Sequence, residues 1–274
     1  MRKQAWVYLL LVAALLPTLL PIYWVVTISL KSVVDQFAVP PVWFRFAATG
    51  EHYRDILFVR PFGRYLWNSV VVAAVATLLA LVLGTAAAYA LARLPMKRNW
   101  NRHLSFWILS TRMVPPIVTI LPLFLLVRDV GLLNTRLALI VVYVGFTLPF
   151  VIWMMRGFFE EVPPELEEAA LMDGSSRLRA LRDIVLPLVA PGLAATAIFC
   201  LIIAWNEFLF ALILTQTDTV MTLPVGIAGR VTQYEIKWGA MSAAGVLAML
   251  PVFLFALAAQ RYLVRGLSLG AVKG

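Results

Sequence analysis

Charged side chains that could carry out chemistry are concentrated in residues 157–186. The acidic residues of this segment are Glu160, Glu161, Glu165, Glu167, Glu168, Asp173 and Asp183, and they stand beside Arg177, Arg179 and Arg182. Pro163 and Pro164 can open a helix, because proline suits the first turn, where its missing N–H is no loss. Acidic residues near that N-terminus are favoured by the helix dipole. The segment therefore predicts a short helix, although its composition alone also fits a solvated acidic loop.

The small side chains of this predicted helix lie on one side. Leu166, Ala169, Ala170 and Asp173 share a face by helical spacing. Gly174 can supply a left-handed C-terminal turn, and Ser175 or Ser176 can cap a second short helix. We expect Ala170 on the outward face, where a partner protein could approach closely.

Two ionisable residues lie inside apolar runs, where charge is expensive and function is the default hypothesis. Arg112 is one, and Glu207 within Trp205-Asn206-Glu207 is the other. Arg112 could instead extend to the membrane surface or pair with backbone carbonyls, and Glu207 could fix the bundle through an interhelical hydrogen bond or salt bridge. Aromatic, amide and carboxylate groups suit sugars, so Trp205, Asn206, Glu207 and Arg112 are candidates for a substrate path.

Other chemistries lack their residue patterns. His52 and His103 have no Cys or carboxylate at metal-ligand spacing, and Cys200 sits alone in an apolar run. No Gly-x-x-x-x-Gly-Lys-[Ser/Thr] sequence occurs, so nucleotide chemistry must come from another chain. We expect no catalysis, metal or cofactor on this chain.

The composition is that of a membrane protein. The 274 residues are 62% hydrophobic and 14% charged, with a mean hydropathy of +0.89, whereas soluble domains are about 45–50% apolar and about 25% charged. About 20 apolar residues span a bilayer as a helix. The sequence predicts an all-α membrane protein with six transmembrane helices, at about Trp6–Leu30, Asn68–Ala92, Leu104–Val127, Leu137–Phe158, Pro187–Leu214 and Ala240–Tyr262.

The basic residues indicate the topology. They flank the first span (Arg2, Lys3), fill the second connection (Arg93, Lys97, Arg98, Arg102) and follow the last span (Arg261, Arg265, Lys273). Lys and Arg are retained on the cytoplasmic side, so both termini are expected in the cytoplasm. This placement explains the net charge of +9 without nucleic acid as a partner.

Packing between spans is also indicated. Small residues recur every four positions in the second span, at Ala76, Ala80, Gly84, Ala88 and Ala92, with a weaker series at Ala240, Ala244 and Ala248 in the last. Small residues let helices approach closely in lipid. Pro115, Pro116 and Pro122 predict a kinked third span, buried among its neighbours rather than facing lipid.

The segment 168–187 resembles a known family. Glu168-Ala169-Ala170, three residues, Gly174, nine residues and Ile184-Val185-Leu186-Pro187 are similar to the EAA motif of permeases of binding-protein-dependent ABC importers. The C-terminal third, with Trp238-Gly239-Ala240, Leu250-Pro251, residues 259–267 and the final Gly270-Ala271-Val272-Lys273-Gly274, resembles the MalG-type subunit of sugar importers.

The resemblance implies a type-1 ABC importer permease fold in a bacterial or archaeal inner membrane, surrounded by lipid. It implies a coupling helix at about 164–174 that docks on an ATPase, through Glu168, Ala169, Ala170, Leu171, Asp173 and Gly174. It further implies a homologous MalF-type permease partner, two ATPase subunits that hold ATP and Mg²⁺, and a solute-binding protein that delivers a sugar, oligosaccharide or polyol. Residues 62–262 would form the permease core, after an N-terminal helix and first periplasmic loop (1–61) and before a cytoplasmic tail (263–274).

Two other classes remain open from the residues alone. A polytopic membrane enzyme, such as a lipid-modifying transferase, would need a cluster of charged or His residues at one membrane face. A secondary transporter would need matching halves or ion-binding residues. Co-purification of an ATPase chain would separate the importer from both.

Overall fold

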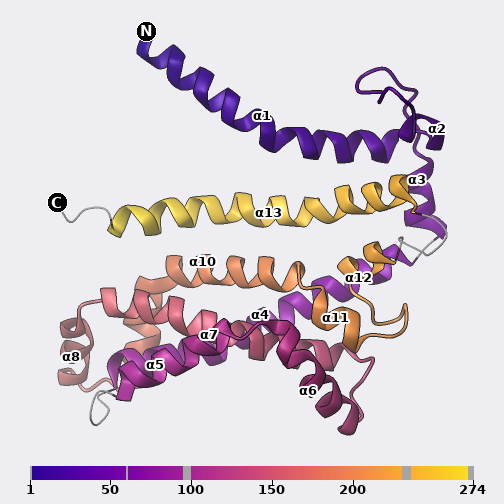
Figure 1. Ribbon diagram of the computed structural model, residues 1–274. Coiled ribbons are helices and arrows are strands. Elements are labelled where there is room, and N and C mark those ends of the chain that lie inside the picture. Colours follow the sequence, from indigo (N-terminus) through magenta and orange to yellow (C-terminus); the bar gives the residue numbers. More distant parts are fainter. Residues whose placement is uncertain (1, 60, 95–99, 230–235, 271–274) are drawn as a thin grey trace. The chain divides into compact units, whose positions relative to one another are not determined.

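The computed structural model describes residues 2–59, 61–94, 100–229 and 236–270, and their elements are helical (Figure 1). Within these described ranges, five helices are long and apolar enough to cross a membrane, or six when one bent pair is counted as a span. They are α1 (Arg2–Leu30), α4 (Phe62–Arg93), α7 (Arg136–Glu161), the run of α9 (Arg177–Ala180), η4 (Leu181–Val185) and α10 (Leu186–Trp205), and α13 (Trp238–Gly270). The all-α membrane prediction is confirmed. Of the flanking cations, Lys97, Arg98, Lys273 and the side chains of Arg2, Lys3, Arg261 and Arg265 lie outside the described residues.

The third span is broken. It consists of α5 (Trp100–Ser110), η3 (Thr111–Met113) and α6 (Pro116–Asp129), and its two parts are bent by 92°. A residue before proline is pushed out of the helical region, and Val114 and Pro115 have ψ values of 121° and 131°. The predicted kink is confirmed. The prediction that this span is buried among neighbours is wrong within this chain, because Phe106, Trp107 and Leu121 are each more than 60% exposed.

The fifth span is also interrupted. We predicted one run to Leu214, but α10 ends at Trp205 and α11 (Leu209–Leu214) begins after a gap of three residues. The Glu207 carboxylate accepts the backbone N–H groups of Phe210 and Ala211, at 2.8 and 3.1 Å. These donors have no carbonyl partner at a helix N-terminus, so the Glu207 side chain stabilises a new helix start where the sequence pattern alone indicates continuity.

The predicted small-residue stripe on α4 is a packing face. Ala76, Ala80 and Ala88 are fully buried, and a Cβ on Gly84 would lie 2.6 Å from Val151 Cγ1 of α7. On α10, Gly192 likewise lies against the Phe158 ring of α7, with no room for a Cβ. Helices α4 and α10 both pack on α7, and this packing holds the loop between α7 and α10 in place.

The chain divides into two compact units. The first comprises residues 1–66 and 223–251, and includes α1, α2 (Val33–Gln36), α3 (Glu51–Arg54), η1 (Asp55–Val59) and α12 (Leu223–Ala228). Its loop after α1 is fixed by His52, whose Nε2 lies 2.9 Å from both Lys31 O and Gln36 Nε2. The second unit comprises residues 67–222 and 252–274 and holds the candidate sites.

Candidate coupling loop and membrane sites

The predicted short helix is α8 (Pro164–Met172), which lies between α7 and α9 (Figure 1). Pro163 is its N-cap and Pro164 occupies its first position, where proline needs no hydrogen bond. Gly174 has a φ of +84°, and the N–H of Ser175 returns to the Ala170 carbonyl at 2.9 Å. The Ser176 hydroxyl then accepts the N–H of Arg179 and caps α9. The expected helix and left-handed turn are both confirmed.

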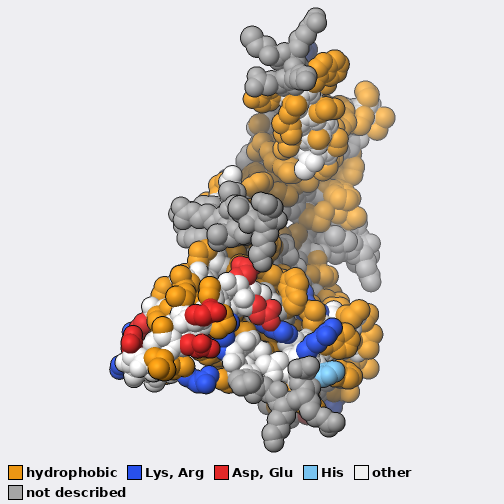
Figure 2. All heavy atoms as spheres, turned by 90° about the vertical axis from the view of Figure 1, so that its left-hand side faces the viewer, with side chains coloured by type: hydrophobic (Ala, Val, Ile, Leu, Met, Phe, Trp, Pro, Cys, Tyr) orange, Lys and Arg blue, Asp and Glu red, His pale blue; other side chains and the backbone are white. Residues whose placement is uncertain are grey.

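Helix α8 has an outward and an inward face. Glu168, Ala169, Leu171, Asp173 and Gly174 are exposed. Three apolar side chains extend the exposed surface: Leu166, Met172, which is 89% exposed, and Leu178 on α9. Figure 2 looks onto the side of the molecule where α8 lies, and acidic, basic and hydrophobic side chains gather there. The exposed side of this loop therefore combines acidic, basic and apolar side chains, and Ala169 is a small side chain among them.

Ala170 differs from our expectation. Ala170 is only 8% exposed and lies on the inward face of α8 together with Glu167. Residues three apart share a helix face. Ala170 therefore lies on the same face as Glu167, whereas Ala169 lies on the same face as Leu166. The expectation that Ala170 faces outward is therefore wrong. The small Ala170 side chain packs inside this chain and not against a partner protein.

Glu167 connects α8 to the end of α4. Its Oε2 accepts the Tyr89 hydroxyl at 2.7 Å and its Oε1 accepts Arg93 Nε at 2.5 Å. Arg93 also donates through Nη2 to the Val162 carbonyl at 2.6 Å. The Arg93 and Glu167 side chains are only 9% and 10% exposed. The sequence explains Arg93 by topology and Glu167 by the helix dipole, and the contact between them depends on tertiary packing that the local sequence does not reveal.

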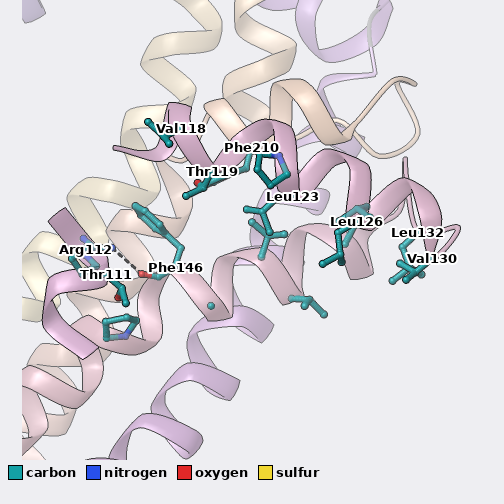
Figure 3. A pocket seen from close by; sticks show the side chains of 17 residues that line it. Thr111, Arg112, Val118, Thr119, Leu123, Leu126, Val130, Leu132, Phe146 and Phe210 are labelled. Atoms are coloured by element: carbon teal, nitrogen blue, oxygen red, sulfur yellow. Dashed lines mark hydrogen bonds between the residues drawn. The ribbon is translucent and has the colours of Figure 1, made fainter. Parts of the chain in front are cut away.

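Arg112 lines a cavity of about 640 Å³ formed by η3, α6, α7 and α11 (Figure 3). Its Nη1 donates to the Phe146 carbonyl at 2.9 Å, and its guanidinium stacks 4.4 Å from the Phe146 ring centroid. Pairing with a backbone carbonyl was the structural alternative for this residue, and the geometry matches it. Among the described residues that line the cavity, Arg112 alone carries a charge.

The cavity walls are mainly hydrocarbon. Besides the Arg112 guanidinium, the polar side-chain groups among the described lining residues are the hydroxyls of Thr111 and Thr119. These hydroxyls donate to the Ile108 and Pro116 carbonyls at 2.6 and 2.9 Å. A sugar brings many hydroxyl groups, each costly to bury without a partner. The cavity therefore suits an apolar occupant better than a sugar.

The remaining path candidates do not join Arg112 in one site. The Trp205 side chain is buried edge-on against Phe255, with ring centroids 6.2 Å apart. Asn206 is exposed and donates through Nδ2 to the Ile202 carbonyl at 2.8 Å. Glu207 caps α11, as described above. Asn206 and Glu207 thus mark a break in a membrane span.

Within the described residues, no three His, Cys, Asp or Glu side chains gather where they could hold a metal ion. The geometry is that of a helical membrane bundle with one short helix displayed beyond α7. Residues 80–269 match the family described as "Binding-protein-dependent transport system inner membrane component". The chain belongs to this family.

Two relatives extend the match over most of the chain. The trehalose transport system permease protein SugB of Mycobacterium tuberculosis is 40% identical, covering 93% of this chain and 93% of its own length. The diacetylchitobiose uptake system permease protein DasC of Streptomyces coelicolor is 35% identical over 99% of this chain and 98% of its own length.

A solved structure shares the permease fold. It is a chain of a bacterial ABC transporter involved in the import of the acidic polysaccharide alginate, with a TM-score of 0.79 and 24% identity. The match covers 95% of this permease and 96% of that chain. The type-1 ABC importer permease fold is thereby established for this chain.

Proposed function

We propose that this permease is one of two membrane-spanning subunits of an ATP-driven carbohydrate importer. Its family and its similarity to permeases named for trehalose and diacetylchitobiose support a sugar, oligosaccharide or polyol as cargo. A solute-binding protein would deliver the cargo and a homologous permease would complete the path. Residues 62–262 would form the permease core.

The observation that carries the proposal is the outward face of α8. A short helix beyond a span, with Ala169 flanked by exposed Leu166 and Met172, is shaped for insertion into a groove of another protein. We assign this face, with Glu168, Leu171 and Asp173 at its sides, to contact with an ATPase subunit. ATP and Mg²⁺ would be held there, since this chain lacks the glycine-rich phosphate loop.

We propose that the break at Asn206 and Glu207 lines the translocation path. Irregular backbone at membrane depth is tolerated only when buried in protein or lining a cavity, and transporter sites are typically built at broken helices. The exposed Asn206 amide can hydrogen-bond a sugar hydroxyl, whereas Arg112 is the weaker candidate because its surroundings are apolar.

The proposed topology places both termini and α8 in the cytoplasm. The cations next to the spans support it, including Arg93 at the end of α4. The tail from residue 263 would extend α13 into the cytoplasm.

The proposal is tested by purifying the complex through a tag on this chain. The wild-type protein is expected to retain an ATPase chain. Ala169→Trp fills the proposed contact and should reduce ATPase retention, with the permease still inserted. Ala190→Trp enlarges an alanine on α10 that is also exposed and serves as the control. Full retention in Ala169→Trp would remove α8 as the docking element.

A further inference from the structure

The buried contacts of Glu167 link two elements that are distant in sequence. Helix α8 is joined by the chain to α7 and α9, but α4 ends more than 70 residues earlier. Tyr89 and Arg93 of α4 both donate to the one carboxylate of Glu167. The Glu167 carboxylate therefore connects the docking helix directly to the cytoplasmic end of a membrane span.

The geometry of this link is rigid. Bidentate and charge-assisted hydrogen bonds fix orientation as well as distance, and Arg93 bonds both Glu167 and the Val162 carbonyl just before α8. The Tyr89 ring packs edge-on against Phe159 of α7, with centroids 5.6 Å apart. The last turn of α4, the last turn of α7 and the first turn of α8 are thus held as one body.

A buried ion pair is a poor device for stability alone, because desolvation offsets most of its attraction. The outward residues of α8 could meet an ATPase without any charge on the inward side. What the inward charges add is directional: the hydrogen bonds to the Glu167 carboxylate fix the orientation of α8 relative to the end of α4.

We propose that the Tyr89–Glu167–Arg93 cluster transmits movement of α8 to α4 during transport. These are positioning residues, which touch neither cargo nor nucleotide. Without the link, α8 can still bind the ATPase and move with it, but the loop around α8 deforms and α4 does not move. The inference rests on the proposed function of α8 and adds the route by which docking moves the membrane helices.

The test replaces the polar link without leaving a lone buried charge. The double variant Arg93→Met/Glu167→Leu substitutes apolar side chains of similar size, which buried ion pairs often tolerate. The control is Arg156→Met/Glu160→Leu, which removes an ion pair lying within α7, with a side chain 51% exposed at Glu160. Both residues of this pair belong to α7, so the pair does not connect α7 to another helix.

Complexes of wild type and variants are reconstituted in proteoliposomes with the solute-binding protein, and uptake and ATP hydrolysis are measured on the same preparation. The quantity compared is cargo imported per ATP hydrolysed. We expect the link variant to retain its ATPase chain and lose about tenfold in this ratio, an ordinary size for coupling between sites. The control should keep the wild-type ratio.

A merely structural role gives another result. Yield, hydrolysis and uptake would then fall together while the ratio per complex stays at the wild-type value, and this overturns the proposal. If the double variant does not assemble, Arg93→Met/Glu167→Gln decides, because it removes both buried charges while the Gln side-chain carbonyl can still accept the Tyr89 hydroxyl. A lower ratio supports the link and an unchanged ratio overturns it.

Failure of the proposed function would look different from failure of the link. In the first case the wild-type complex itself would carry no ATPase or import nothing with ATP. In the second the wild type is active and the variants match it.

Discussion

At Gly174 the backbone has a φ of +84°, a region that L side chains rarely adopt, while the space around a Cβ is open. A substitution there is strained by backbone conformation and by nothing else. The turn decides where α8 ends and how the chain enters α9, so a change in this one residue acts on the whole loop.

Gly174→Val is therefore expected to weaken ATPase retention and uptake together, through a backbone penalty of about 1–2 kcal/mol. Gly174→Asn should be milder, because Asn tolerates the left-handed region. Gly131→Ala is the control, since Gly131 has a φ of +72° in a loop outside the docking face. The amount of ATPase that co-purifies with each variant distinguishes the three substitutions. An equal loss of ATPase in Gly131→Ala would show a general folding defect.

Glu207 has a defined role as the cap of α11. Glu207→Leu removes the acceptor of two backbone N–H groups and should destabilise the complex by about 0.5–2 kcal/mol, seen as a lower melting temperature in detergent. Glu207→Gln keeps one acceptor and should assemble normally. If Glu207→Gln then imports at the wild-type rate, the carboxylate charge has no part in the path.

Asn206 gives the cleaner test of the path. Its side chain is exposed and, within the part of the chain that the structure describes, hydrogen-bonds the Ile202 carbonyl alone. Asn206→Ala should assemble normally and reduce uptake several-fold by removing a hydrogen-bonding group worth about 0.5–1.5 kcal/mol. The measurement is the concentration dependence of uptake with saturated binding protein. Unchanged uptake would place the path elsewhere.

At the scale of elements, α4 and α10 pack on α7 at Gly84 and Gly192. The contact of α4 follows from sequence, because a four-residue repeat of small residues specifies a close helix contact, whereas the contact at Gly192 was not predicted. The kink at Pro115 and Pro116 follows too. The break after Trp205 does not, because Asn206 and Glu207 are two adjacent polar residues in a largely apolar run, and the interruption depends on where the Glu207 carboxylate finds N–H donors. Likewise, the inward face of α8, which includes Ala170, is set by the contacts of Glu167 with α4, and local spacing cannot specify such long-range contacts.

The packing of α4 on α7 makes a distinct prediction. Gly84→Ala places a Cβ 2.6 Å from Val151 Cγ1, and such overpacking costs about 1–3 kcal/mol. Gly157→Ala, in α7 with open space around its Cβ, should be neutral or slightly stabilising, because alanine favours helix. Thermal unfolding of the purified complex checks the pair. Similar melting temperatures for both variants would contradict the close contact.

At the scale of the whole molecule, the proposed function requires α8 and the loop that follows α11 to lie on opposite sides of the membrane. Arg182→Cys and Gln216→Cys place single exposed thiols on the two sides, with the buried Cys200 replaced by Ser. An impermeant reagent added outside intact cells should label Gln216→Cys alone. Labelling of both would contradict the topology drawn from the cations.

The central claim is that ATP on the α8 side drives import of a carbohydrate delivered to the other side. The most direct measurement uses proteoliposomes that hold the complex purified through this chain. Trehalose, maltose or diacetylchitobiose is presented on a solute-binding protein outside, with ATP enclosed. We predict uptake that needs both enclosed ATP and the binding protein, and that ceases in the Ala169→Trp variant. Uptake driven by an ion gradient without ATP, or undiminished in Ala169→Trp, would contradict the account.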